Sequence, residues 1–325
     1  MKHVWLVMVC ALVALAGCGG QGGDGADVPG APDQIEIAVI PKGLVHQFWL
    51  TVRAGAEAAA EELEVAVIWQ GPAKETEVAK QIDIVRDMLN RGVDAIVLAA
   101  CDANALIPVV EEADRANVPV ITIDSGVNSD VPKSLVATDN IAGARTAADK
   151  LAELIGKAGK VGLIPFVPGA ATSEWREEGF KEGIKAYPDI ELVATLYSQS
   201  DVAKGMDVTQ DMLTSHPDLD GIFAASEPGA VGAAQAVKAA GKTGEVKLVG
   251  FDASEEEIAA VEDGTIQALI VQNPFKMGYL GVQSAVNALR GEPVDKRIDT
   301  GVAVITRENL DSPEIQALLN PQAAQ

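Results

Sequence analysis

Short apolar runs alternate along the chain with segments in which apolar residues recur every three or four positions. Val52, Ala56, Ala59 and Leu63 form one such segment, with the spacing of the buried face of a helix. The intervening runs are rich in valine and isoleucine, which is typical of strands that are buried on both faces. In the first half of the chain, the pattern predicts strands at residues 35–40, 65–68, 95–98 and 118–123.

The second half of the chain repeats the pattern, beginning with a helical stripe from Ile141 to Ile155. A long apolar helix is also expected from about Phe275 to Leu289. About ten alternating strand and helix units predict an α/β fold of parallel sheets, and they are too many for one ordinary open sheet. We expect two sheets, with an eight-fold β/α barrel as the competing architecture. The strands expected here cover residues 161–164, 192–195, 222–224, 247–250 and 268–271.

The N-terminus has the form of a secretory signal. Lys2 gives it a positive start, and residues 4–16 are almost all apolar but too few to span a bilayer as a stable helix. Small residues then precede Cys18, an arrangement that resembles the lipobox of bacterial lipoproteins. We expect residues 1–17 to be removed as a signal peptide and Cys18 to be lipidated. The alternative is an ordinary signal with an incidental cysteine.

Composition narrows the classes of partner. Residues 18–34 are rich in glycine and are expected to be a flexible tether behind the lipidated cysteine. Acidic residues outnumber basic ones by 47 to 25, for a formal net charge of -22, which disfavours nucleic acid and anionic lipid surfaces as partners.

Beyond Cys18 the only cysteine is Cys101, so the mature chain can form no internal disulfide, and this residue is interpreted as a small buried side chain.

Two expected strands end in an aspartate, one in each half of the chain. Asp124 follows the strand at 118–123, and Asp252 follows the strand at 247–250 after one further residue. Ligands of open α/β sheets bind beyond the carboxyl ends of the strands, so both carboxylates could face a cleft. Aspartate is equally suited to capping the next helix, and the spacing leaves both roles open.

Motifs of catalytic and cofactor sites are missing from the sequence. It contains no glycine-rich dinucleotide loop, no phosphate loop, no zinc-protease motif and no nucleophile elbow. The residues 138–140 offer a hydroxyl and an acid, but no histidine is near enough in sequence to serve as a base. His46 and His216 are far apart, and no metal-site spacing occurs. The sequence therefore predicts no catalytic residues, no metal and no cofactor.

Six segments together resemble the type I periplasmic binding proteins of sugar ABC transporters, in particular the ribose-binding group. Their order and intervals match over nearly the whole mature chain. The resemblance implies two Rossmann-like lobes with parallel sheets, joined by three crossovers near Asp139, Gln272 and Gly301. The segments are residues 48–49, 120–124, 137–140, 172–180, 249–252 and 271–274.

The resemblance also implies domain boundaries. The N-terminal lobe would comprise residues 35–139 plus 273–301. The C-terminal lobe would comprise residues 140–272 plus 302–325. The three crossovers between these stretches would form a hinge.

The same resemblance implies which side chains face a cleft between the lobes. Ser125 replaces the arginine that follows the first aspartate in ribose binders, and Ser200 stands where an aromatic residue is usual, which puts ribose itself in doubt. The expected ligand-binding residues are His46, Phe48, Trp49, Asp124, Arg176, Glu227, Asp252 and Gln272. Further candidates are Lys42, Trp69, Ser125 and Ser226.

These residue types suit a hydroxylated ligand on chemical grounds. Each sugar hydroxyl both donates and accepts hydrogen bonds, carboxylates accept from two hydroxyls at once, and arginine donates through a rigid fork. Aromatic faces cover the C–H surface of a sugar ring. Each role has an alternative: core packing for Phe48 and Trp49, a surface ion pair for Arg176, and an exposed loop for Lys42 and His46.

The resulting functional hypothesis is a monomeric, lipid-anchored protein outside the cytoplasmic membrane. It would bind a monosaccharide or polyol and deliver it to an ABC permease. One alternative is a sensor that presents its ligand to a chemoreceptor or histidine kinase. Another is an extracytoplasmic α/β enzyme acting on sugars, for which the sequence offers no catalytic pair, so we expect no enzymatic activity.

Overall fold

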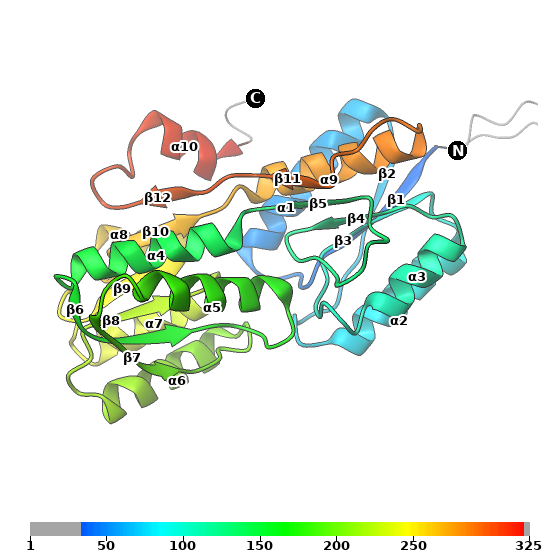
Figure 1. The fold of residues 1–325 in the computed structure, drawn as a ribbon. Coiled ribbons are helices and arrows are strands. Elements are labelled where there is room, and N and C mark those ends of the chain that lie inside the picture. The colour runs from blue at the N-terminus through cyan, green and yellow to red at the C-terminus, as the bar shows by residue number, and fades with distance from the viewer. Residues whose placement is uncertain (1–33, 322–325) are drawn as a thin grey trace, which may run out of the picture. The chain divides into compact units, whose positions relative to one another are not determined.

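The computed structural model describes residues 34–321 (Figure 1). The predicted signal peptide, Cys18 and most of the predicted tether lie outside these residues. From Gln34 onward the chain is one compact unit that contains two six-stranded sheets, so the eight-stranded barrel is excluded. No helix within residues 34–321 is both long enough and apolar enough to cross a membrane.

The first sheet and its helices form the first lobe. Its strands are β1 (Glu36–Ile40), β2 (Ala66–Trp69), β3 (Ala95–Leu98), β4 (Val120–Ile123), β5 (Ser134–Ala137) and β11 (Arg297–Asp299). Its helices are α1 (Gln47–Leu63), α2 (Val78–Arg91), α3 (Ile107–Arg115) and α9 (Pro274–Leu289). The strand order is β11-β5-β4-β3-β1-β2, and all the pairs are parallel. Ile37 and Val39 pack with α1 and α9, whereas Ala38 and Ile40 pack with α2 and α3, which explains the unbroken apolar run of this strand.

The second sheet and its helices form the second lobe. Its strands are β6 (Ala158–Ile164), β7 (Asp189–Thr195), β8 (Gly221–Ala224), β9 (Lys247–Phe251), β10 (Ala268–Val271) and β12 (Ala303–Ile305). Its helices are α4 (Asn140–Leu154), α5 (Ala171–Ile184), α6 (Val202–Ser215), α7 (Glu227–Ala239), α8 (Glu255–Glu262) and α10 (Pro313–Leu319). The order is β12-β10-β9-β8-β6-β7, and only the β12–β10 pair is antiparallel among the described strands. Phe180 of α5 and Phe223 of β8 stack with ring centroids 5.0 Å apart, in a core cluster that includes residues of α4.

The chain passes between the two sheets three times, after β5, after β10 and after β11. The first and third passages lie against each other, because the hydroxyls of Thr138 and Thr300 are 3.3 Å apart and Asp299 accepts a hydrogen bond from the backbone N–H of Asp139. The expectation of two lobes of mostly parallel sheets is confirmed. Each lobe is thus assembled from stretches that are far apart in the sequence.

Candidate ligand-binding site

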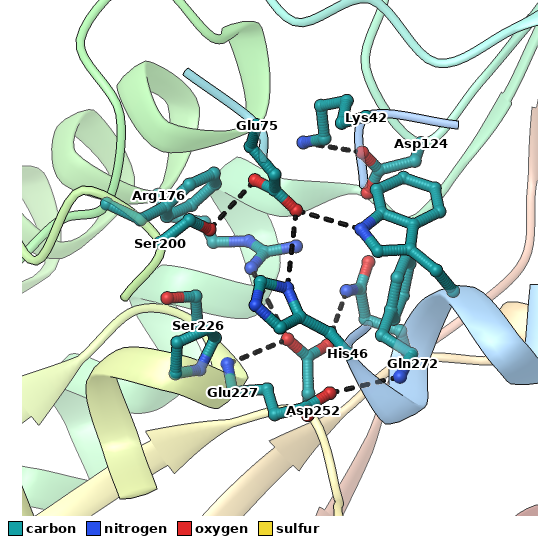
Figure 2. A pocket seen from close by; sticks show the side chains of 14 residues that line it. Lys42, His46, Glu75, Asp124, Arg176, Ser200, Ser226, Glu227, Asp252 and Gln272 are labelled. Carbon is teal, nitrogen blue, oxygen red and sulfur yellow. Dashed lines mark hydrogen bonds and ion pairs between the residues drawn. The ribbon is translucent and has the colours of Figure 1, made fainter. Parts of the chain in front are cut away.

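A cavity of about 310 Å³ lies where strands of both sheets end at their carboxyl side. Figure 2 shows polar side chains from both lobes pointing around this common space. All eight expected ligand-binding residues and the candidates Lys42 and Ser226 line it. The complete lining is Lys42, His46, Phe48, Trp49, Glu75, Asp124, Phe166, Arg176, Ser200, Ser226, Glu227, Pro228, Asp252 and Gln272.

The aspartates at the two strand ends have a left-handed backbone conformation. Asp124 has φ 55° and Asp252 has φ 84°, in the left-handed region that side chains other than glycine rarely adopt. Neither is the N-cap of the helix that follows it in the sequence: α8 is capped by Ser254, and the first helix after Asp124 is α4, which is capped by Asp139. The sharp turn after each strand therefore directs the carboxylate into the cavity.

Asp252 accepts hydrogen bonds from neutral donors of the second lobe and lies near one cation. Its Oδ1 accepts a hydrogen bond from Gln272 Nε2 at 2.7 Å, and its Oδ2 accepts from the backbone N–H of Glu227 at 3.2 Å. Arg176 Nη1 lies 3.9 Å from Oδ2. Burial raises the pKa of Asp252, and the charge of Arg176 only partly offsets this effect.

Arg176 is buried and is fixed by three kinds of contact. Its Nε donates to Asn140 Oδ1 at 2.7 Å and its Nη1 donates to the carbonyl of Ala225 at 2.8 Å. The guanidinium lies 3.7 Å from the ring centroid of Phe251. Burial lowers the pKa of Arg176, but a guanidinium keeps its charge in proteins. Its Nη2 donates to no residue within 34–321, so this nitrogen remains available to a ligand.

Asp124 lies beside the ammonium group of Lys42. Lys42 Nζ is 2.8 Å from Asp124 Oδ2, yet that oxygen accepts no hydrogen bond of acceptable angle from the described residues. The contact is therefore an ion pair, and the carboxylate oxygen can still accept from a ligand. Two more buried atoms of the cavity, Ser226 Oγ and Gln272 Oε1, have no partner within residues 34–321. Such atoms are costly unless a ligand or water satisfies them.

Glu227 contacts the first lobe through both of its oxygens. Oε1 accepts from the backbone N–H of Gln47 and Oε2 from that of Phe48, each at 3.0 Å. These are the first N–H groups of α1, whose N-cap residue His46 makes no side-chain capping bond. Burial raises the pKa of Glu227 despite these two bonds. Glu227 therefore serves as a cap for a helix of the other lobe.

The aromatic residues divide between the cavity and the core. Trp49 is 1% exposed and packs into the first-lobe core, and its ring makes a T-shaped contact with the ring of Phe48 at a centroid distance of 4.9 Å. Phe166, which the sequence did not single out, lines the cavity from the second lobe. The structure places Trp69 away from the cavity, on β2 against the same core. Ser125 is also outside the lining, although it contacts Lys42.

Glu75 is a central residue of the cavity that the sequence interpretation missed. It accepts hydrogen bonds from Trp49 Nε1 at 2.8 Å and from Ser200 Oγ at 2.9 Å, and His46 Nδ1 lies 3.7 Å away. Its surroundings lower the pKa of Glu75 to about 2, because Lys42, His46 and these donors outweigh the effect of burial. Nothing in the polar segment 71–77 distinguishes this glutamate from an exposed loop residue.

This shift predicts a specific acid sensitivity. The pKa of Glu75 falls from an ordinary 4.5 to about 2 on folding, so its stabilising effect is complete above pH 4.5 and is lost as the pH falls towards 2. We expect Glu75→Gln to lower the free energy of unfolding at pH 7 by up to about 3 kcal/mol and to flatten its decline between pH 5 and 3. Denaturant titrations at a series of pH values measure this. The exposed Glu61→Gln on α1 is the control, and equal acid slopes in both variants would contradict the assignment.

Metal binding finds no support in the described part of the chain. Among residues 34–321, no group of three or more histidine, cysteine, aspartate or glutamate side chains is arranged to hold a metal ion. Cys101 is buried, and burial raises the pKa of its thiol well above the usual range, so it is not a reactive thiolate.

Comparison with known proteins agrees with this architecture. A model of the periplasmic binding protein domain matches residues 37–293. The ribose import binding protein of Haemophilus influenzae is 34% identical over 85% of this chain and 92% of its own length. The D-ribose/D-allose-binding protein of Pseudomonas aeruginosa is 32% identical over 85% of this chain and 90% of its own length.

Solved structures give the same result. An ABC transporter solute-binding protein of Agrobacterium vitis with bound D-fucose superimposes with a TM-score of 0.84 and 40% identity, covering 86% of this chain and 98% of that one. A carbohydrate transporter solute-binding protein of Agrobacterium radiobacter in complex with D-arabinose superimposes with a TM-score of 0.87 and 35% identity. The match covers 89% of this chain and 100% of that one. The family expected from the six segments is therefore confirmed, and the chain belongs to the periplasmic binding protein domain family.

Proposed function

We propose that this protein is the extracytoplasmic solute-binding component of an ABC importer and that it binds one neutral monosaccharide or similar polyol between its lobes. The observation that carries the proposal is the pairing of Asp252 and Arg176 in the second lobe opposite Asp124 in the first, around a cavity of about 310 Å³.

The free polar atoms of the cavity match the chemistry of hydroxyl groups. Asp124 Oδ2 and Gln272 Oε1 can only accept, Arg176 Nη2 can only donate, and Ser226 Oγ can do either. A sugar hydroxyl satisfies one acceptor and one donor at the same time. Phe166 and Phe48 add ring surfaces from opposite lobes, which suits the apolar C–H side of a sugar.

Charge argues against anionic ligands. The cavity lining contains four carboxylates, against two permanent cations and a histidine: Glu75, Asp124, Glu227 and Asp252 against Lys42, Arg176 and His46. Most oxygens of the carboxylates already accept from protein donors, and Lys42 is paired with Asp124. A phosphorylated sugar would bring further negative charge into this setting and should be excluded.

The relatives support the ligand class without fixing the ligand. The names of two relatives refer to ribose and allose, and two solved neighbours contain D-fucose and D-arabinose. All are named as binding or import proteins, which supports a protein that delivers its ligand to a permease and catalyses no reaction. The proposed lobes are residues 35–139 plus 273–301 and residues 140–272 plus 302–325, linked by the three passages between the sheets.

The location belongs to the same proposal. Members of a periplasmic family act outside the cytoplasm, and the small residues before Cys18 support a lipid anchor on that cysteine, with residues 1–17 as signal peptide and 18–34 as tether. Labelling with a fatty-acid analogue, compared between the native protein and Cys18→Ser, tests the anchor; equal labelling would rule it out.

A thermal-shift screen of the purified protein tests the proposed ligand class. A ligand present at 100 times its Kd adds about 2.7 kcal/mol of stability, which should raise the melting temperature by roughly 5 °C or more. We expect such a shift with at least one neutral pentose, hexose or polyol and none with sugar phosphates. Asp252→Ala screened in parallel should lose most of the shift. A response confined to phosphorylated sugars, or to none of the neutral ones, would overturn the proposal.

A further inference from the structure

A buried polar cluster joins the two lobes at the cavity wall. Lys42 lies in the connection between β1 and α1, and Ser125 follows β4, so both belong to the first lobe. Thr172 lies in the first turn of α5, which packs on α4 in the second lobe. Their exposed fractions are 2%, 0% and 0%. Side chains from opposite lobes are thus in contact where solvent is excluded.

The hydrogen bonds of this cluster form a closed triangle. Lys42 Nζ donates to Ser125 Oγ and to Thr172 Oγ1, each at 3.1 Å, and the two hydroxyls are 2.9 Å apart. The remaining side of the ammonium faces Asp124 Oδ2 at 2.8 Å. Lys42 therefore donates two of its three N–H groups within the cluster, and its charge is paired with Asp124.

Two bonds of the triangle exist only while the lobes touch. Opening the lobes separates Thr172 from Lys42 and Ser125 and leaves the Lys42–Ser125 bond intact. Other contacts between the lobes, Glu227 with α1 and Glu75 with Ser200, lie closer to solvent, where water can replace a lost partner. The bonds to Thr172 are fully buried, so the closed arrangement gains more from them.

The charge state of Lys42 is consistent with this role. Burial alone would lower the pKa of Lys42, but the neighbouring Asp124 and Glu75 outweigh it, and the pKa is raised. The ammonium therefore stays charged, and its bonds to the two hydroxyls are charge-assisted.

We propose that Lys42, Ser125 and Thr172 form a latch that fastens the two lobes, and that Thr172 is a positioning residue that sets how long the ligand is retained without touching it. Thr172 is absent from the cavity lining. The inference rests on the proposed function for its effect on ligand release, but the bonds of the latch join side chains of the protein alone.

Thr172→Val tests the latch, because valine keeps the volume of threonine and removes only the hydroxyl. In the closed state Lys42 and Ser125 then each lose a buried partner, whereas in the open state water satisfies them. We expect the ligand found by the screen to dissociate about 10-fold faster, with an association rate that changes less than 2-fold. Thr209→Val is the matched control, because Thr209 is equally buried in the second lobe and donates to the carbonyl of Gly205 within its own helix.

Small-angle scattering without a ligand separates a failed latch from a failed ligand assignment. We expect the ligand-free Thr172→Val protein to have a larger radius of gyration than the native protein and Thr209→Val, because the latch holds part of the ligand-free population closed. An unchanged radius would overturn the latch, whether or not a sugar binds. A native dissociation rate in Thr172→Val, or a fall in melting temperature beyond that of Thr209→Val, would also overturn it.

Discussion

Asp252→Ala should weaken ligand binding by roughly 30-fold or more, which corresponds to at least about 2 kcal/mol of binding free energy. The carboxylate is buried at the end of β9, and the left-handed turn at this residue directs it into the cavity. Its loss removes charge-assisted bonds to ligand hydroxyls in a site that excludes water. Gln272 and Arg176 would also lose the group that orients them.

The stability of the ligand-free variant distinguishes a ligand role from a structural one. Ser254 caps α8, so that helix keeps its cap, and the loss of the bond from the first N–H of α7 to Asp252 should cost no more than about 1 kcal/mol. Two further effects of the substitution on the free energy of unfolding act in opposite directions. Arg176 loses its charged partner, which destabilises the fold, whereas the removal of a buried charge, whose cost raises the pKa of Asp252, stabilises it. Calorimetric titration of the variant measures its affinity for the ligand, and denaturant unfolding measures the free energy of unfolding of its ligand-free form. Asp211→Ala on the exposed face of α6 is the control for loss of one negative charge.

The pH dependence of binding should follow the same carboxylate. The pKa of Asp252 is raised above 3.8 by burial, and the protonated form accepts fewer hydrogen bonds from hydroxyls. As the pH is lowered, affinity should therefore begin to fall at a higher pH than it would if Asp252 had the pKa of an ordinary aspartate. Asp252→Asn should remove this dependence. A normal affinity in Asp252→Ala together with a weakened ligand-free fold would make the ligand role untenable.

Much of the fold could be predicted from the sequence, because most strands are buried on both faces and therefore appear as unbroken apolar runs. The run from Ile37 to Ile40 is entirely apolar, and the structure buries it between α1 and α9 on one side and α2 and α3 on the other. The strands β5, β11 and β12 were not predicted. They are three or four residues long, and β11 has exposed charges at Arg297 and Asp299, so hydrophobic pattern does not reveal them.

A site residue could be predicted where it meets at least one of two conditions, a place at a strand end or a match to the family pattern, and the pattern alone marks Arg176 and Gln272. Asp124 and Asp252 meet both conditions, whereas Glu75 lies in a polar segment whose partners, Trp49 and Ser200, are distant in sequence. The contact of Glu227 with α1 could not be predicted either, because it joins backbone groups 179 and 180 residues away. Such contacts depend on how the lobes meet, which local sequence patterns do not specify.

Arg176→Met should have an even larger effect than the loss of Asp252. The substitution keeps a long side chain but removes the charge that partly compensates Asp252 and the Nη2 donor, which no residue within 34–321 uses. Breaking a buried ion pair by removing one member costs about 3–5 kcal/mol, because the other charge stays buried without a partner. We expect affinity to fall by roughly 100-fold or more and the free energy of unfolding to decrease measurably.

Arg176→Lys separates charge from geometry. Lysine keeps a positive charge near Asp252, but its single nitrogen cannot reproduce the planar fork that reaches Asn140, Ala225 and the cavity together. We expect it to recover most of the lost stability and little of the lost affinity. Titrations of both variants between pH 5 and 8 should show the acid-induced fall in affinity moving to higher pH only in Arg176→Met, because only there does Asp252 lose its compensating charge. Affinity restored by lysine to the native level would show that Arg176 acts through charge alone, and would contradict the assignment of Nη2 as a donor to the ligand.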